Sequence, residues 1–337
     1  MRGGKHMVLK EIVVQRKNLI TLAAATAMLV GFGLGSASAV DYPKRPITMI
    51  CPWGAGGGTD AVSRILATLL KTQLRVPVNV VNRTGGSGAI GHTAMATAKP
   101  DGYTVGLATV EITMMHWMGL TKVTYRDMTA VCMVNSDPAG INVRSDAAWK
   151  TYKDLERSVR ETPGNFTASG TGQGGIWHLA MAGWLRAIGM PPTAVKWIPS
   201  KGAAPALQDL MAGGIDMSTC SLPEAATLIE AGRIRPLALM ADKRDPLFPD
   251  VSTLKDIGVN WSCGAWRGVV VPNGTPPQIV DILEKAIKKI VDSEDFKKFM
   301  KNRGYGIRWM DSKSFAKAMA EADETNGQIM KTAGIIK

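Results

Sequence analysis

The 337-residue sequence contains few cysteines, and they are far apart. Cys51, Cys132, Cys220 and Cys263 are its four cysteines, and no two of them form a C-x-x-C pair. This low density excludes a small disulfide-stapled scaffold, and the spacing gives no zinc site. Three complete pairings stay open in an oxidising compartment, although Cys51 and Cys132 lie in apolar strand-like runs that are equally typical of buried free thiols.

Catalytic signatures are also missing from the sequence. It has no G-x-S-x-G nucleophile elbow, no H-E-x-x-H motif and no Gly-Lys-Ser/Thr after a glycine-rich loop. His92 and His178 fall in expected helices, where histidines more often pack or form hydrogen bonds than bind a ligand. We therefore expect a protein that is not an enzyme and that has no cofactor and no metal.

The chain has no strong excess of charge of one sign once its N-terminal segment is set apart. It carries 40 Lys and Arg against 28 Asp and Glu, and residues 1–39 hold 5 of the basic and 1 of the acidic residues. The remaining 35 basic and 27 acidic residues give a net charge of about +8. The densest basic stretch, residues 285–303, alternates with apolar residues at helical spacing, which indicates solvated helix faces. We expect no nucleic-acid partner.

The N-terminal segment has the three parts of a secretory signal peptide. Basic residues come first, an uncharged and mostly apolar run follows over Leu19–Gly35, and Ala37-Ser38-Ala39 gives a small-x-small cleavage site. An uncleaved membrane anchor is the alternative, but the run is short for a span and leads into a cleavage site. We expect residues 1–39 to be removed after Ala39, and the mature protein to be free in the periplasm.

Short β-like runs alternate with helical stretches from residue 47 to residue 240, and mainly helical stretches follow from residue 278. This alternation is typical of βαβ units, so it predicts an α/β fold with largely parallel sheets and two domains. The expected strands are 47–52, 76–81, 103–108, 129–134, 140–143, 166–168, 194–198, 215–219, 234–240, 266–271 and 305–309.

The first glycine-rich turn joins an expected strand to an expected helix. Its residues are Trp53, Gly54, Ala55, Gly56, Gly57, Gly58, Thr59 and Asp60. Glycines let the backbone approach a ligand closely, and the N–H groups at a helix start attract anions, so the turn is a candidate cradle for a carboxylate or a phosphate. The alternative is a tight structural turn in which Thr59 or Asp60 caps the helix.

Two further glycine-rich turns precede expected helices. Gly86–Gly91 satisfies the G-x-G-x-x-G pattern of dinucleotide-binding proteins, with Glu111 near the position of a ribose-binding acid. The turn begins late after its strand, however, and exported proteins seldom meet soluble nicotinamide cofactors. The third turn, Ser169–Gly175, contains Thr171, Gly172, Gln173, Gly174 and Gly175. Three such junctions favour helix N-termini that converge on one cleft.

Several ordered segments carry a family resemblance. They are residues 42–47, 52–60, 82–91, 99–104, 178–180, 200–210, 231–238 and 272–276. Together they resemble the substrate-binding proteins of tripartite tricarboxylate transporters over nearly all of residues 42–337. The resemblance implies a two-domain, periplasmic-binding-protein-like (type II) fold with the ligand cleft between the domains. Domain 1 would comprise residues 40–141 and 264–337, and domain 2 would comprise residues 142–263.

The resemblance also implies a function and a set of contacts. A monomeric receptor would capture a small organic carboxylate and deliver it to the membrane permease subunits of the transporter. Residues 53–59 would meet a ligand carboxylate, residues 171–175 would meet the distal part of the ligand, and His178 and Asp216 belong to the same expected site. An exported α/β enzyme, a dinucleotide-binding protein, or a ligand sensor with the same fold is the alternative.

The sequence departs from the family pattern at the distal loop and in the charges expected near the cleft. Gly175 stands where a serine is usual, so a hydroxyl donor is missing there. Glu111 lies where the family places cleft-facing residues, and it would repel a second ligand carboxylate and favour an amine, whereas Arg267 would do the reverse. We expect a monocarboxylate or an amino-bearing carboxylate as the ligand.

Overall fold

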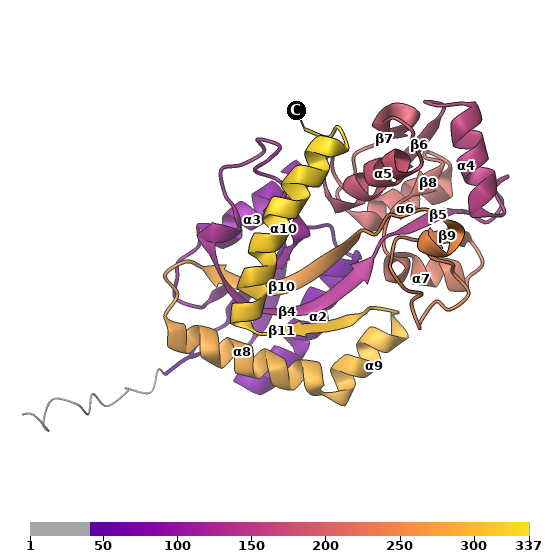
Figure 1. Cartoon of the computed structure of the whole chain (residues 1–337). Helices are drawn as coiled ribbons and strands as arrows, with labels where there is room; N and C mark the ends of the chain where they lie inside the picture. The colour runs from indigo at the N-terminus through magenta and orange to yellow at the C-terminus, as the bar shows by residue number, and fades with distance from the viewer. Residues whose placement is uncertain (1–40, 337) are drawn as a thin grey trace, which may run out of the picture. The chain divides into compact units, whose positions relative to one another are not determined.

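Two β-sheets organise the chain in the computed structural model, which describes residues 41–336 (Figure 1). The first sheet has the strand order β11-β4-β10-β3-β1-β2, and β1 pairs in parallel with β2 and β3. The strand β10 is antiparallel to β3 and β4, and β11 is antiparallel to β4. The bounds of these strands are β1 Ile47–Cys51, β2 Val78–Asn82, β3 Thr104–Thr109, β4 Met128–Pro138, β10 Gly264–Pro272 and β11 Ile307–Met310.

Helices cover both faces of the first sheet because apolar side chains alternate along its strands. In β10, Val269 and Val271 pack on one face and Val270 packs on the other. The first face is covered by α2 (Gly58–Leu74), α8 (Pro277–Asp292) and α9 (Glu294–Asn302). The second face is covered by α3 (Ala89–Ala96) and α10 (Ser312–Thr332). A layered core of this kind holds the ends of β1, β3 and β10 in fixed positions.

The second sheet has the strand order β7-β6-β8-β5-β9. The strand β6 is parallel to β7 and β8, and β5 is antiparallel to β8 and β9. The helix α5 is buried over nearly its whole length, and the indole N–H of Trp184 donates to the Tyr152 hydroxyl at 2.9 Å. The bounds are β5 Gly140–Arg144, β6 Phe166–Ser169, β7 Val195–Trp197, β8 Met217–Ser218, β9 Ile234–Leu239, α4 Tyr152–Glu161, α5 Ile176–Ala187, α6 Ala203–Ala212 and α7 Leu222–Glu230.

The chain passes between the two sheets at two adjacent places. The strand β4 ends at Pro138 in the first sheet and β5 begins at Gly140 in the second, while the return passage lies at Cys263 and the start of β10. The Ala139 N–H donates to the Cys263 carbonyl at 2.8 Å, so the two passages are hydrogen-bonded side by side. The helix α10 packs against both β4 and α5, and so contacts elements of both sheets.

Short 3₁₀ turns complete the structure. They are η1 Gly86–Gly88, η2 Val110–Thr113, η3 Tyr125–Asp127, η4 Pro192–Ala194 and η5 Lys255–Ile257. The residues from Tyr42 onward form one compact unit. In that part of the chain the four cysteines are free thiols, and Cys51, Cys132 and Cys220 are buried.

The alternation of strands and helices expected from the sequence agrees with the α/β fold, but the expectation of largely parallel sheets is wrong. Both sheets are mixed, because the strands that carry the chain between the sheets, β4, β5 and β10, pair antiparallel with their neighbours. A periodic sequence pattern marks each strand without giving its direction.

Two expectations about membranes and export concern different parts of the chain. Among residues 41–336, no helix has the length and apolar character needed to cross a bilayer. The expected signal peptide, residues 1–39, and its cleavage after Ala39 lie outside the described residues.

Candidate ligand-binding site

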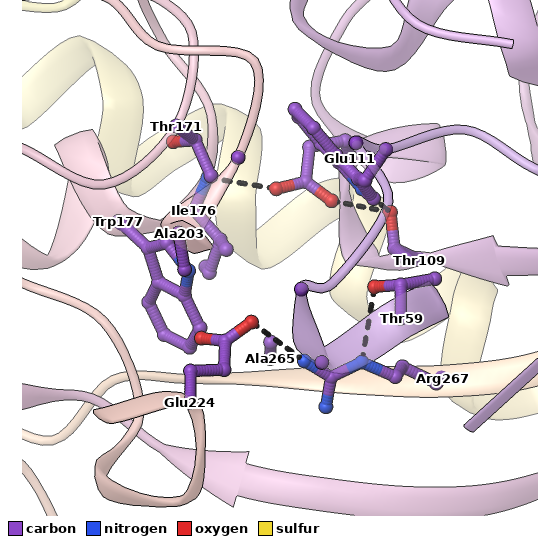
Figure 2. Close-up of a pocket in the computed structure, with 15 residues that line it drawn as sticks. Thr59, Thr109, Glu111, Thr171, Ile176, Trp177, Ala203, Glu224, Ala265 and Arg267 are labelled. Atoms are coloured by element: carbon purple, nitrogen blue, oxygen red, sulfur yellow. Dashed lines mark hydrogen bonds and ion pairs between the residues drawn. The ribbon is translucent and has the colours of Figure 1, made fainter. Parts of the chain in front are cut away.

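A small cavity lies between elements of the two sheets, and its lining comes from six distant parts of the chain (Figure 2). Its free volume is about 20 Å³, which is room for roughly one water molecule. The lining residues are Trp53, Gly54, Gly57, Gly58, Thr59, Thr109, Glu111, Thr171, Ile176, Trp177, Gly202, Ala203, Glu224, Ala265 and Arg267. Residues at the starts of α2, α5 and α6 all line this cavity, so three helix N-termini converge on it.

The start of α2 presents free backbone donors. Its N-cap is Gly57, which has no side chain to satisfy the first turn of the helix. Within the described residues, no acceptor pairs with the backbone N–H groups of Gly58, Thr59 and Asp60. Gly58 and Thr59 line the cavity directly. Free N–H groups at the positive end of a 17-residue helix form an anion-binding position.

Asp60 holds the first glycine-rich turn in shape and does not line the cavity. Its carboxylate accepts hydrogen bonds from the Gly56 N–H at 3.0 Å, from Arg64 at 2.9 Å and from the Asn82 amide at 2.9 Å. Burial raises the pKa of Asp60, but these bonds outweigh it and hold the pKa below its ordinary value. Ala55 and Gly56 also lie outside the cavity lining.

Glu111 lines the cavity from the first sheet and contacts the second. It lies in η2, directly after β3, and is 2% exposed. Its Oε1 accepts from the Ile176 N–H at the start of α5 at 3.0 Å, and its Oε2 accepts from the Thr109 hydroxyl (Figure 2). Burial raises the pKa of the Glu111 carboxyl, against the opposing effect of these two donors. The side chain therefore connects two helix-forming segments across the cavity.

Arg267 is a buried guanidinium on the opposite side of the cavity from Glu111. It is 2% exposed and lies in β10, close to the return passage. It forms ion pairs with Asp137 of β4 at 2.7 Å and with Glu224 of α7 at 3.2 Å, and it donates to the Thr59 hydroxyl at 3.1 Å. Burial lowers the pKa of Arg267, but Glu224 and Asp137 outweigh it, so the guanidinium stays charged.

The third glycine-rich turn contributes one cavity-lining side chain, Thr171. A Cβ built on Gly175 would lie 2.5 Å from the Thr171 hydroxyl oxygen. The hydroxyl that the sequence lacks at Gly175 is thus replaced by a threonine hydroxyl that occupies the neighbouring space. Gly172, Gln173 and Gly174 form the turn but do not line the cavity.

The second glycine-rich turn contacts the third at the edge of the two sheets. The Ser87 hydroxyl donates to the Gln173 carbonyl at 2.7 Å, and Ser87 has a φ of 51°. The turn opens the eight-residue helix α3, and no residue of Gly86–Gly91 lines the cavity. In this chain, therefore, the second glycine-rich turn contacts the third, and the Glu111 carboxylate accepts from the start of α5.

His178 and Asp216 also lie outside the cavity. The His178 Nδ1 accepts from the Gly174 N–H at 3.0 Å, and its ring stacks on Trp197 with centroids 4.8 Å apart. Burial lowers the pKa of His178 to about 4, so the ring is neutral and shapes the third turn. The Asp216 carboxylate accepts from the N–H and the hydroxyl of Thr167, each at 2.8 Å, which ties β6 to the segment before β8.

Seven lining residues were not anticipated from the sequence. They are Thr109, Ile176, Trp177, Gly202, Ala203, Glu224 and Ala265, whereas Arg267 was expected near the cleft as a charged residue. Gly202 and Ala203 could have been predicted, because they form a fourth strand–glycine–helix junction at the start of α6. Glu224 forms a capping box with Ser221, a pattern that predicts only a helix start. Ala265 gave no signal at all.

The chemistry of the cavity suits binding. Its walls offer backbone N–H groups, the hydroxyls of Thr59 and Thr171, two indole rings, and the charged groups of Glu111, Glu224 and Arg267. Among residues 41–336 no group of three His, Cys, Asp or Glu side chains could hold a metal ion. Such a set of donors and acceptors recognises the polar ends of a small solute.

Comparisons with known proteins identify the family. The model of the tripartite tricarboxylate transporter family receptor matches residues 62–335. A Cupriavidus necator protein named UPF0065 protein in gbd 5′ region is 30% identical over 331 residues, which is 96% of this chain and 99% of that protein.

Solved structures agree with this match. The periplasmic binding protein BugD is 29% identical, with a TM-score of 0.82 over 88% of this chain and 100% of that one. MatC of Rhodopseudomonas palustris, solved with bound malate, is 25% identical, with a TM-score of 0.79 over 86% of this chain and 99% of that one. The expected resemblance is confirmed: the chain belongs to the tripartite tricarboxylate transporter receptor family, and it is a solute-binding receptor with a periplasmic-binding-protein fold, not an enzyme.

Proposed function

We propose that this receptor captures a small carboxylate-bearing solute in the cavity of Figure 2 and delivers it to the membrane permease of a tripartite transporter. We propose further that it acts in the periplasm after removal of residues 1–39, and that residues 40–141 with 264–337 and residues 142–263 are its two domains. The contacts expected from the sequence that line the cavity are Trp53, Gly54, Gly57, Gly58, Thr59, Glu111 and Thr171.

The start of α2 carries this proposal. A carboxylate placed there would accept from the N–H groups of Gly58 and Thr59, which have no other acceptor in the described residues. Those N–H groups are fixed before the ligand arrives, so little ordering is needed on binding. The related protein MatC was solved with malate, a small carboxylate, bound to it.

The small volume of the cavity implies that the receptor opens to admit its ligand. About 20 Å³ cannot hold a solute of even five or six heavy atoms. Opening would separate Glu224 from Arg267 and Glu111 from Ile176, which are contacts between elements of different sheets. The two adjacent passages at Ala139 and Cys263 are the natural hinge, because few residues must change their backbone angles there.

A ligand panel tests the proposal. The chain from Val40 is unfolded and refolded to remove any carried ligand, and thermal unfolding is measured with mono-, di- and tricarboxylates, amino acids, sugars and nucleotides. A ligand at a hundred times its Kd adds about 2.7 kcal/mol to the free energy of unfolding, which shifts Tm visibly. Stabilisation by sugars or nucleotides alone would contradict the proposal.

Two neighbouring glycines give a matched pair of variants. A Cβ on Gly58 would lie 2.5 Å from the Arg267 guanidinium and 2.8 Å from the Glu224 carboxylate, whereas a Cβ on Gly57 meets nothing closer than 3.5 Å. Gly58→Ala should weaken binding of the panel's carboxylate ligand at least tenfold, because the methyl group enters the cavity. Gly57→Ala should bind nearly as the unchanged protein does, measured by calorimetric titration. Equal losses in both variants would contradict a site at Gly58.

A further inference from the structure

Glu111 is a buried carboxylate without a cationic partner. Its two hydrogen-bond donors, the Ile176 N–H and the Thr109 hydroxyl, are both neutral. No ion pair in the described part of the chain includes Glu111, although it is only 2% exposed. A buried charge is costly when no opposite charge compensates it, so this position is electrostatically incomplete without a ligand.

Arg267 does not supply the positive charge that Glu111 lacks. Its guanidinium charge is already shared between Asp137 at 2.7 Å and Glu224 at 3.2 Å, and two further N–H groups donate to Asn135 and Thr59. The cavity and its immediate surroundings therefore hold three carboxylates, on Glu111, Glu224 and Asp137, against one guanidinium. These side chains therefore carry a net negative charge, and a ligand with two or three carboxylates would increase the electrostatic repulsion.

We propose that the cavity selects zwitterionic solutes, in which a carboxylate binds the N–H groups at the start of α2 and a cationic amino group binds Glu111. This inference rests on the proposed function and specifies its ligand class. Glu111 lines the cavity beside the start of α5, whereas Glu224 lies beside Gly58 and is already paired with Arg267, so Glu111 is the acidic group left for the amino end (Figure 2).

The geometry gives each end of such a solute a different wall. The carboxylate end requires donors only, which Gly58 and Thr59 supply at the start of α2. The amino end requires acceptors only, which the Glu111 carboxylate supplies. Each oxygen of Glu111 accepts one hydrogen bond, from the Ile176 N–H or from the Thr109 hydroxyl, and so keeps accepting capacity for a ligand N–H. A dicarboxylate would leave its second carboxylate facing Glu111, and the residues that line the cavity offer no cation except Arg267, which is already paired.

The test uses sets of three acids that share one carbon skeleton. Each set contains a 2-amino acid, the 2-hydroxy acid and the unsubstituted acid: aspartate with malate and succinate, leucine with 2-hydroxy-4-methylpentanoate and 4-methylpentanoate, and phenylalanine with 3-phenyllactate and 3-phenylpropionate. The affinities are measured by calorimetric titration of the refolded protein. We expect the amino acid of the best-binding set to bind at least tenfold more tightly than both of its analogues.

Glu111→Gln should reduce that preference about tenfold, because the amide keeps the shape and loses the charge. Glu230→Gln, at the exposed end of α7, removes the same charge away from the cavity and should leave the preference unchanged. If Glu111→Gln does not fold, the preference of the unchanged protein still decides the matter.

The outcomes separate this inference from the proposed function. Tighter binding of malate, succinate or a plain monocarboxylate than of its amino analogue overturns the zwitterion inference and leaves the carboxylate receptor intact. An amino acid preference that is the same in Glu111→Gln as in Glu230→Gln overturns the role of Glu111. Failure of every carboxylate, with or without an amino group, overturns both proposals.

Discussion

Arg267 joins more of the molecule than any other charged side chain that lines the cavity. It contacts β4 through Asn135 and Asp137, α2 through Thr59, and α7 through Glu224. Because they are buried, the guanidinium and its two carboxylate partners have lost their contacts with water and interact with one another instead. Burial raises the pKa of Asp137, and the nearby Arg267 opposes this, so the pair depends on both members being present.

Arg267→Met should destabilise the protein by about 3–5 kcal/mol, because it leaves the Asp137 and Glu224 carboxylates buried without a cation. Chemical denaturation of the ligand-free protein measures this loss. The double variant Arg267→Met with Asp137→Asn should recover part of it, since one of the stranded charges is removed. Arg244→Met, which breaks an exposed ion pair with Asp256, should cost less than about 1 kcal/mol. Similar losses for the two single variants would contradict the importance of the buried pair.

The sequence predicts cavity-lining residues that belong to a local backbone motif. It does not predict lining residues that the fold brings in from a distant segment. Gly57, Gly58 and Thr59 sit in a strand–glycine–helix junction, which is a local pattern, and they line the cavity. Glu224 reaches the cavity only because α7 of the second sheet packs near β10 of the first, which no local pattern reveals. Asp216 is the opposite case: the sequence placed it in the expected site, but its carboxylate binds Thr167 of β6 instead.

At the scale of single elements, caps decide where several helices begin. The helix α4 starts after Thr151, whose hydroxyl accepts from the Asp154 N–H at 3.3 Å, while the Asp154 carboxylate accepts from the Thr151 N–H at 2.9 Å. This capping box satisfies two backbone donors that the helix itself leaves unpaired. None of these atoms lines the cavity.

Thr151→Ala should lower the free energy of unfolding by about 1 kcal/mol, because α4 loses its capping oxygen. Thr151→Ser keeps the hydroxyl and should lie close to the unchanged protein. Thermal unfolding of the three proteins in parallel makes the comparison, and ligand affinity should be equal in all of them. A loss in Thr151→Ser as large as that in Thr151→Ala would show that the methyl group, and not the cap, is what matters.

Elements with strong periodicity were predictable, and the pairing of elements was not. The apolar spacing in Ile282, Leu283, Ile287 and Ile290 predicts a helix near residues 278–291, and α8 spans Pro277–Asp292. Strand β8 is short, with only Met217 and Ser218 in the ladder, although the apolar run suggested 215–219. Strand direction depends on which segment returns to which sheet, and this information is spread over more than a hundred residues.

At the scale of the whole molecule, buried histidines link stability to pH. The His92 Nδ1 donates to the Gly88 carbonyl at 2.8 Å, and its Nε2 accepts from the Thr109 N–H at 3.1 Å. Both ring nitrogens are therefore committed in the neutral form, and a proton on Nε2 would face an N–H group. Burial lowers the pKa of His92 to about 4, with a smaller opposing effect from the bond to Gly88.

His92→Gln should show how much of the acid sensitivity comes from this ring. The unfolded chain binds a proton at His92 below its ordinary pKa of about 6.5, and the folded chain does so only near 4. The contribution of the neutral ring to stability is thus complete above pH 6.5 and is lost as the pH falls toward 4. The unchanged protein should lose about 2 kcal/mol more than the variant between pH 7 and pH 5, measured by denaturation at each pH. Parallel pH profiles for the two proteins would contradict this assignment.

The place of β10 in the first sheet constrains how the chain can acquire its structure. β10 lies between β3 and β4, yet it comes 126 residues after β4 ends at Pro138 and 155 after β3 ends at Thr109, counting to Gly264. Until Gly264–Pro272 is available, β3 keeps one ladder edge open and β4 keeps both, because its other neighbour, β11, comes later still. The second sheet draws all its strands from residues 140–239 and has no such dependence. A chain that emerges gradually, from a ribosome or through a membrane channel, can therefore form its second sheet first. The first sheet keeps open strand edges, which favour aggregation, until the last quarter of the chain is released.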